Sequence, residues 1–183
     1  MRSGIDCFMP GGTAADLFAS ISLRNQAERV TAYEQFAVGG FRVLPVELQH
    51  DVENYGYLIY DTAERVKAVY ITDTFYCPAV FKGVNVFVVE CNYIHDTMMA
   101  NYRAGSIPEA YMHRLLRSHF ELDNVIKFLK ASDLTQCRAV VLVHLSDRNS
   151  DAERMIREVE AATGVQTTAA ESGMEVEISG EPY

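Results

Sequence analysis

The chain has 183 residues, of which 49% are hydrophobic and 22% charged, a composition typical of a globular protein with one domain. Asp and Glu outnumber Lys and Arg by 25 to 16, and the net charge of −9 opposes tight non-specific binding to nucleic acid. No apolar run approaches the roughly 18 residues of a membrane span, and the N-terminus has no apolar signal core. We therefore expect a cytoplasmic location and no membrane contact.

The first half of the chain is predicted to consist mainly of strands. A short strand at 5–9, a turn at 10–12 and a helix at 14–20 capped by Thr13 come first. Strands at 29–33 and 41–46 surround a turn at 38–40, a hairpin pairs 55–60 with 67–72, and 85–91 is a buried strand.

The second half is predicted to be helical around one buried strand. Helices are expected at 96–102, at 108–117, and at 122–130 after a capping box of Ser118 and Glu121. A strand at 138–144 follows, then a helix from a second capping box, Ser150 and Glu153, to Gly164, and strands at 165–168 and 174–178. Strands followed by helices that flank buried strands predict a layered α/β sandwich.

The four cysteines form no C-x-x-C pair and have no zinc-finger spacing. We expect buried, reduced thiols at Cys7, Cys77, Cys91 and Cys137.

Three apolar segments end in residues that can bind a metal. Segment 44–49 leads to His50 and Asp51, segment 68–72 to Asp73, and segment 139–143 to His144. Loops at one edge of the sheets build the site in layered α/β folds, and imidazole and carboxylate groups are ligands of zinc, manganese and iron. Each residue alone also has a structural interpretation, as a hydrogen-bonded histidine or a turn-forming aspartate.

Four motifs follow one another along the chain: Gln49-His50-Asp51 before segment 55–59, segment 69–74 with Asp73, Glu90-Cys91-Asn92-Tyr93 before Arg117-Ser118-His119, and Val143-His144-Leu145-Ser146. They resemble motifs of the metallo-β-lactamase-fold hydrolases, and the resemblance covers residues 3–178. The third is similar to the branch that includes exonuclease-like, YycJ-type proteins. The resemblance implies the αββα sandwich of that family.

The resemblance also implies a site for divalent zinc or manganese. Asp73 would bridge two metals, with His50 bound to one and His144 to the other. The family motif H-x-H-x-D-H, which supplies further ligands, occurs nowhere in the chain. Each metal then has at most two protein ligands, so we expect weak binding unless another chain or Asp51 completes the site.

The missing motif predicts that residues 1–183 form a single domain, the C-terminal portion of the sandwich without its N-terminal sheet. A naturally shortened protein, one part of a longer chain, and a reading frame begun at an internal methionine all stay open as explanations. Because the inner face of the remaining sheet would be uncovered, we expect a homo-oligomer or a chain that supplies the missing half.

A phosphate site is predicted next to the metal. His119 is expected at the start of a helix opened by Ser118, where free N–H groups favour anions, and Arg114 and Arg117 share a face of the preceding helix. His119 and Asp73 are the candidate catalytic residues. The alternative is that both arginines interact only with the dipole of their own helix.

Three functions remain open from the sequence. The first is a metal-dependent phosphodiesterase or nuclease that needs the missing half for activity. The second is a non-catalytic binding or assembly module with a vestigial metal site. The third is a homo-oligomer whose subunits share ligands across an interface. Fold alone does not decide between them.

Overall fold

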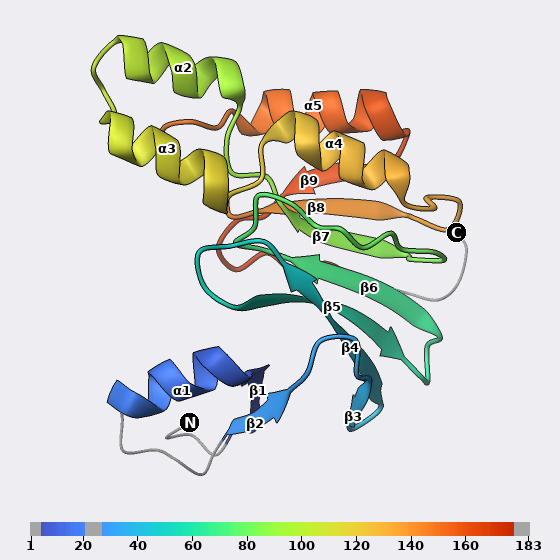
Figure 1. Ribbon diagram of the computed structural model, residues 1–183. Coiled ribbons are helices and arrows are strands. Elements are labelled where there is room, and N and C mark those ends of the chain that lie inside the picture. The colour runs from blue at the N-terminus through green and yellow to red at the C-terminus, as the bar shows by residue number, and fades with distance from the viewer. Residues whose placement is uncertain (1–4, 21–26, 178–183) are drawn as a thin grey trace.

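The computed structural model describes residues 5–20 and 27–177, and its main element is a mixed seven-stranded sheet (Figure 1). The strands lie side by side in chain order: β3 (Phe36–Val38), β4 (Phe41–Leu48), β5 (Asn54–Asp61), β6 (Val66–Ile71), β7 (Val86–Glu90), β8 (Ala139–Val143) and β9 (Thr167–Ala169). Neighbours from β3 to β6 are antiparallel, and neighbours from β6 to β9 are parallel.

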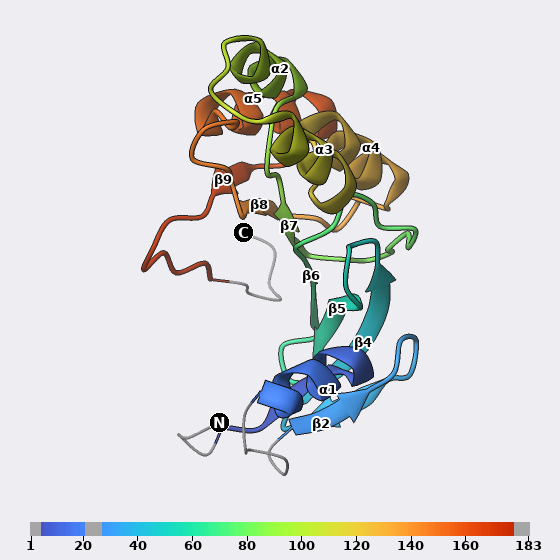
Figure 2. The same ribbon diagram turned by 60° about the vertical axis from the view of Figure 1, so that its left-hand side comes forward.

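A small unit lies beside the β3–β4 end of this sheet (Figures 1 and 2). It consists of β1 (Cys7–Pro10), α1 (Gly11–Ser20) and β2 (Ala27–Val30), with β1 and β2 paired in parallel. The ring of Phe8 stacks on that of Phe36, with centroids 5.0 Å apart. The predicted turn at 10–12 and cap at Thr13 are wrong, because the helix begins at Gly11, directly after β1.

Helices α4 (Leu122–Ala131) and α5 (Ala152–Thr163) cover one face of the parallel strands, and α2 (His95–Arg103) and α3 (Glu109–Ser118) pack together at the end of the sheet (Figures 1 and 2). The core between strands and helices includes Val69, Phe87, Leu142, Val125 and Met155, all 0% exposed. None of the described helices is long and apolar enough to cross a bilayer.

Both predicted capping boxes are wrong. The N-cap of α4 is Glu121, which makes no side-chain cap bond. The N-cap of α5 is Asp151, one residue after the predicted serine, and its carboxylate accepts the backbone N–H of Arg154 at 3.0 Å. The end of α5 is as predicted, with Gly164 in the left-handed conformation at φ 71°.

Some predicted strands also differ from the structure. The strand expected at 29–33 is β2, at 27–30, and the strand that enters the Gly39-Gly40 turn is β3, which the pattern did not predict. Residues 174–177 form no strand, and Ile178 lies outside the described residues. The other predicted elements between 41 and 144 agree with the structure to within two residues at each end.

All four cysteines are free thiols, but the expected burial is confirmed at only two of them and is wrong for Cys7 and Cys137. Cys77 and Cys91 are buried, and Cys7 and Cys137 are partly exposed. Burial raises the pKa of the Cys77 and Cys137 thiols to about 11 and that of Cys91 further. These three are therefore protonated and weakly nucleophilic near neutral pH.

Candidate metal centre

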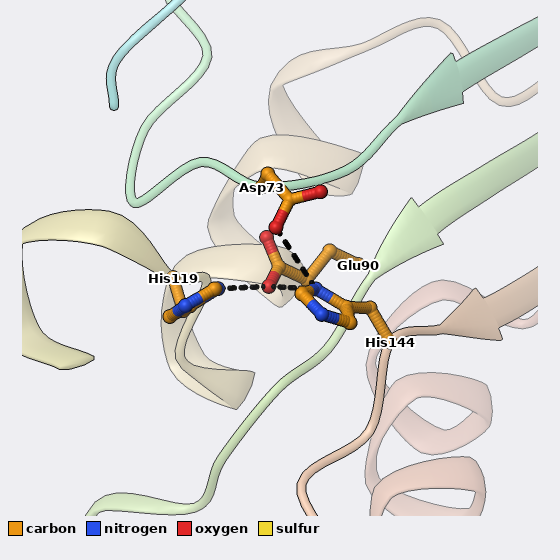
Figure 3. Close-up of side chains that lie close together, drawn as sticks. All are labelled: Asp73, Glu90, His119 and His144. Atoms are coloured by element: carbon orange, nitrogen blue, oxygen red, sulfur yellow. Dashed lines mark hydrogen bonds and ion pairs between the residues drawn. The ribbon is translucent and has the colours of Figure 1, made fainter. Parts of the chain in front are cut away.

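Four side chains at one edge of the sheet lie close enough to share one cation (Figure 3). They are Asp73, Glu90, His119 and His144, and each offers a ligand atom within 4.8 Å of the other three. Glu90 ends β7, while Asp73 and His144 lie just beyond the ends of β6 and β8. Because these strands are adjacent and parallel, their carboxyl ends meet at one edge. His119 joins them from the link between α3 and α4.

The carboxylate of Glu90 is the centre of the hydrogen bonds in this cluster, and it is fully buried. Its Oε1 accepts from Nδ1 of His119 at 2.6 Å and from Nδ1 of His144 at 2.9 Å. Its Oε2 accepts the backbone N–H of Thr74 at 2.8 Å. With Nδ1 of each imidazole bonded to the Glu90 carboxylate, Nε2 of each ring is left for a metal or a substrate.

Asp73 and His144 form the more exposed side of the cluster. Oδ1 of Asp73 lies 3.5 Å from Nδ1 of His144, and the two side chains are 45% and 44% exposed. Both residues have left-handed backbones, with φ 54° and 57°. This conformation costs on the order of 1–3 kcal/mol in a residue with a side chain and is concentrated at functional sites. Aspartate and histidine are among the residue types that tolerate it best.

His50 lies next to the cluster but is not one of its four members. Its ring centroid is 5.9 Å from that of His119, which is 5.2 Å from that of His144, so the three imidazoles form a row. Nδ1 of His50 approaches the Asp51 carboxylate at 2.5 Å without hydrogen-bond geometry, and this buried nitrogen has no hydrogen-bond partner. A buried nitrogen without a partner is what a metal ligand would show in the absence of its metal.

A pocket of about 380 Å³ opens beside the cluster, with His119 and His144 in its wall. Arg114, Arg148 and the exposed ring of Tyr111 also line it. Neither arginine forms an ion pair with any described residue. The carboxylate of Asp147 also lines the pocket, so the two guanidinium groups outnumber the acidic groups in its wall by two to one. This balance favours an anionic ligand, even in an acidic chain.

Two of the predicted phosphate-site residues lie elsewhere. Arg117 is exposed and does not line the pocket. Ser118 is 1% exposed, and its hydroxyl donates to the Arg114 carbonyl at 2.5 Å within α3. The predicted helix N-terminus at Ser118 and His119 is wrong, because His119 is the C-cap of α3 and the next helix begins at Leu122. His119 reaches the site through its bond to Glu90 instead.

Glu90 was missed as a candidate site residue in the sequence. The sequence does mark this residue, because Glu90 follows the apolar run 86–89 just as His144 follows the apolar run 139–143. A carboxylate directly after an apolar strand has the same pattern that selected Asp73. Strand β7, which ends in Glu90, lies between β6 and β8, so its last residue belonged among the candidate ligands for the same reason.

Residues 1–145 match the sequence model of a family described as the beta-lactamase superfamily domain. The chain belongs to the beta-lactamase superfamily. This match confirms the family that the strand-end motifs resemble, whereas the YycJ-type branch stays a prediction. A search of the curated proteins finds no match.

Solved structures of similar fold confirm the architecture. YhfI from Bacillus subtilis, a metallo-β-lactamase fold protein, has a TM-score of 0.67 and 14% identity over 91% of this chain and 62% of its own. Igni18 from Ignicoccus hospitalis, a metallo hydrolase, has a TM-score of 0.61 and 12% identity over 96% of this chain and 69% of its own. The short form of human tRNase Z has a TM-score of 0.60 and 13% identity over 95% of this chain and 68% of its own. The chain thus spans less than two thirds of YhfI.

The residues of the cluster fit a divalent cation. Two imidazoles and two carboxylates within 4.8 Å of one another are the nitrogen and oxygen donors that zinc and manganese bind. Carboxylate bonds to Nδ1 are also the usual way in which metal-binding histidines are oriented. The imidazole of His50, whose Nδ1 lies beside the Asp51 carboxylate, adds a further possible ligand next to the cluster.

Proposed function

We propose that this superfamily member is a metal-dependent phosphodiesterase, nuclease-like in that its substrate is a nucleic acid or a nucleotide. The observation that carries the proposal is the cluster of Asp73, Glu90, His119 and His144 beside a pocket with two unpaired arginines. One protein of similar fold, human tRNase Z, is a nuclease by its name. Its likeness supports the reaction class without determining the substrate.

Zinc or manganese is the proposed cofactor, held by Asp73, His144 and, as the motifs imply, His50. A bound divalent cation would polarise the phosphoryl group and lower the pKa of an attacking water. Glu90 holds the imidazoles of His119 and His144 in fixed directions through their Nδ1 atoms. The metal ligand His144 and the adjacent His119 are therefore oriented by the same carboxylate.

His119 is the proposed general acid. With Nδ1 bonded to Glu90 at 2.6 Å, its imidazole can carry a second proton on Nε2 and donate it to the leaving oxygen of the substrate. The buried carboxylate would stabilise the protonated ring and keep its orientation after transfer. Asp73 is the proposed catalytic partner through its contact with the metal.

The pocket would bind the phosphates of the substrate. Arg114 and Arg148 can pair with phosphate oxygens, and the ring of Tyr111, which is 42% exposed, can stack on a base. These features favour a single-stranded nucleic acid or a nucleotide over a neutral ester. Arg117 and Ser118 lack comparable support from their positions.

One observation favours a second candidate, a binding or assembly module with a vestigial metal site. Both oxygens of Glu90 already accept hydrogen bonds from the protein, so the cluster holds together without a metal. In either case we propose a homo-oligomer, or a chain that carries the H-x-H-x-D-H motif, as the partner.

The test is hydrolysis of bis-p-nitrophenyl phosphate with manganese or zinc. We expect slow turnover by the chain alone and faster turnover when a segment with H-x-H-x-D-H is supplied. His119→Ala should lower the restored rate by about 100-fold, while His113→Ala, an exposed histidine of α3 outside the pocket, should not change it. Turnover without added metal, or an unchanged rate in His119→Ala, would contradict the proposal.

A further inference from the structure

Two members of the cluster depend on an unusual backbone conformation. Asp73 and His144 have φ 54° and 57°. His144 directly follows β8, and one residue separates Asp73 from the end of β6. A positive φ turns the side chain away from the direction that a continued strand would give it. The directions in which these two side chains leave the sheet edge therefore depend on what holds the backbone left-handed.

In both cases an asparagine amide from the neighbouring strand binds the backbone at this position. Nδ2 of Asn54, the first residue of β5, donates to the carbonyls of Thr72 at 2.9 Å and Asp73 at 2.7 Å. Nδ2 of Asn92, two residues beyond β7, donates to the carbonyl of His144 at 2.7 Å. Strand β5 is the neighbour of β6, and β7 is the neighbour of β8.

We infer that Asn54 and Asn92 are positioning residues of the metal site, each holding one left-handed residue in place. Asn92 is 6% exposed and Asn54 is half-buried, so water does not readily replace the donors when they are removed. The carbonyl of Asp73 or His144 would then lose its partner, and the residue would relax towards an ordinary backbone. The inference rests on the proposed metal binding and adds two residues that were not predicted as site residues, although Asn92 lies within the third sequence motif.

The test compares Asn54→Ala and Asn92→Ala with a matched control, Asn85→Ala. Asn85 also ties strands together, since its Oδ1 accepts the backbone N–H of Lys67 at 2.9 Å. It directly precedes β7, which Glu90 ends, and so lies at the opposite end of that strand from the site. Asn54→Asp and Asn92→Asp keep the size of the side chain and remove its N–H donors. Manganese and zinc affinity is measured by titration of the metal-free protein, together with the melting temperature.

We expect Asn54→Ala, Asn92→Ala and both Asp variants to bind metal about tenfold more weakly or worse. Asn85→Ala should keep the metal affinity of the unaltered chain, even if its melting temperature falls as much as those of the Asn54 and Asn92 variants. In metal-free protein, NMR should show a strong contact between the amide and α protons of Asp73 and of His144, as positive φ requires. That contact should weaken at Asp73 in the Asn54 variants and at His144 in the Asn92 variants.

Unchanged affinity in the Asn54 and Asn92 variants, or an equal loss in Asn85→Ala, would overturn the inference. So would left-handed NMR contacts that persist in every variant, or an unaltered chain that binds neither metal. A chain that binds metal and loses affinity as expected, yet hydrolyses no phosphodiester, would contradict the proposed function and leave the inference standing.

Discussion

The two faces of the central strands differ sharply, although the same four strands supply both. Towards the helices, one row across the sheet is Leu58, Val69, Phe87 and Val140, and its last three members are 0% exposed. On the opposite face the adjacent row is Tyr57, Tyr70, Val88 and Val141. In this row Tyr70 is 42% exposed, Tyr57 and Val88 are half-buried, and only Val141 is buried. One face is therefore part of a closed core, while the other keeps apolar groups partly in water.

The difference shows that the covering helices decide which face of the strands becomes the closed core. Both rows are apolar and have the same hydrogen-bonded neighbours, so strand pairing alone does not decide burial. The candidate metal centre lies at the end of these strands, where Glu90 is buried and Asp73 is almost half exposed. The open face is also the surface on which we propose that a partner packs.

The largest expected effect comes from removing a large side chain on each face. Phe87→Ala should lower the free energy of unfolding by about 3–5 kcal/mol, because it leaves a cavity among packed rings. Tyr70→Ala should lower it by less than about 1 kcal/mol, because much of the ring is already in water. Urea unfolding measures both. Equal losses would show that the open face is as well packed as the helix face.

A second prediction concerns self-association through the open face. Exposed apolar sheet surface favours association, so we expect the chain to form dimers or larger assemblies at micromolar concentration. Tyr70→Lys should shift the population towards monomer, because it places a charge on that face. Val80→Lys is the control, since Val80 is exposed at 57% outside the sheet. Light scattering that gives a monomer for the unaltered chain would contradict this proposal.

The smallest effect is expected at the start of α4, on the helix side. Burial, and then the charge of Asp123, raise the pKa of Glu121, so its carboxylate is harder to ionise in the folded chain than in the unfolded chain. The resulting loss of stability appears as pH rises through the ordinary and then the raised pKa, and is complete at neutral pH. Glu121→Gln should then raise the free energy of unfolding at pH 7, measured in urea, by less than about 1 kcal/mol.

The same comparison at acid pH is the control for Glu121. Below the ordinary pKa of glutamate, both chains are neutral at this position, and their unfolding midpoints should coincide. A stabilisation of Glu121→Gln that is equal at both pH values would assign the effect to packing or helix propensity.

The sequence allowed much of this structure to be predicted, for physical reasons that vary by region. The buried strand at 139–143 and the αL glycine at 164 were predictable because apolar runs and C-cap glycines depend on local physics. The capping boxes were not, because Ser118 can instead donate to the preceding turn of its own helix. Convergence of Asp73 and His144 followed from strand ends. The contacts of Asn54 and Asn92 join residues far apart in the chain, and no local pattern predicts such contacts, even though Asn92 lies within a quoted motif.

The metal centre itself is tested most directly by calorimetric titration of the metal-free chain with manganese and with zinc. We predict saturable binding by the unaltered chain and binding at least about tenfold weaker in His144→Ala and Glu90→Gln. In Glu90→Gln the side chain keeps its size but loses the charge that both imidazoles share. His113→Ala should bind like the unaltered chain. No binding at all, or equal affinity in the three variants, would contradict the assignment of this cluster as a metal site.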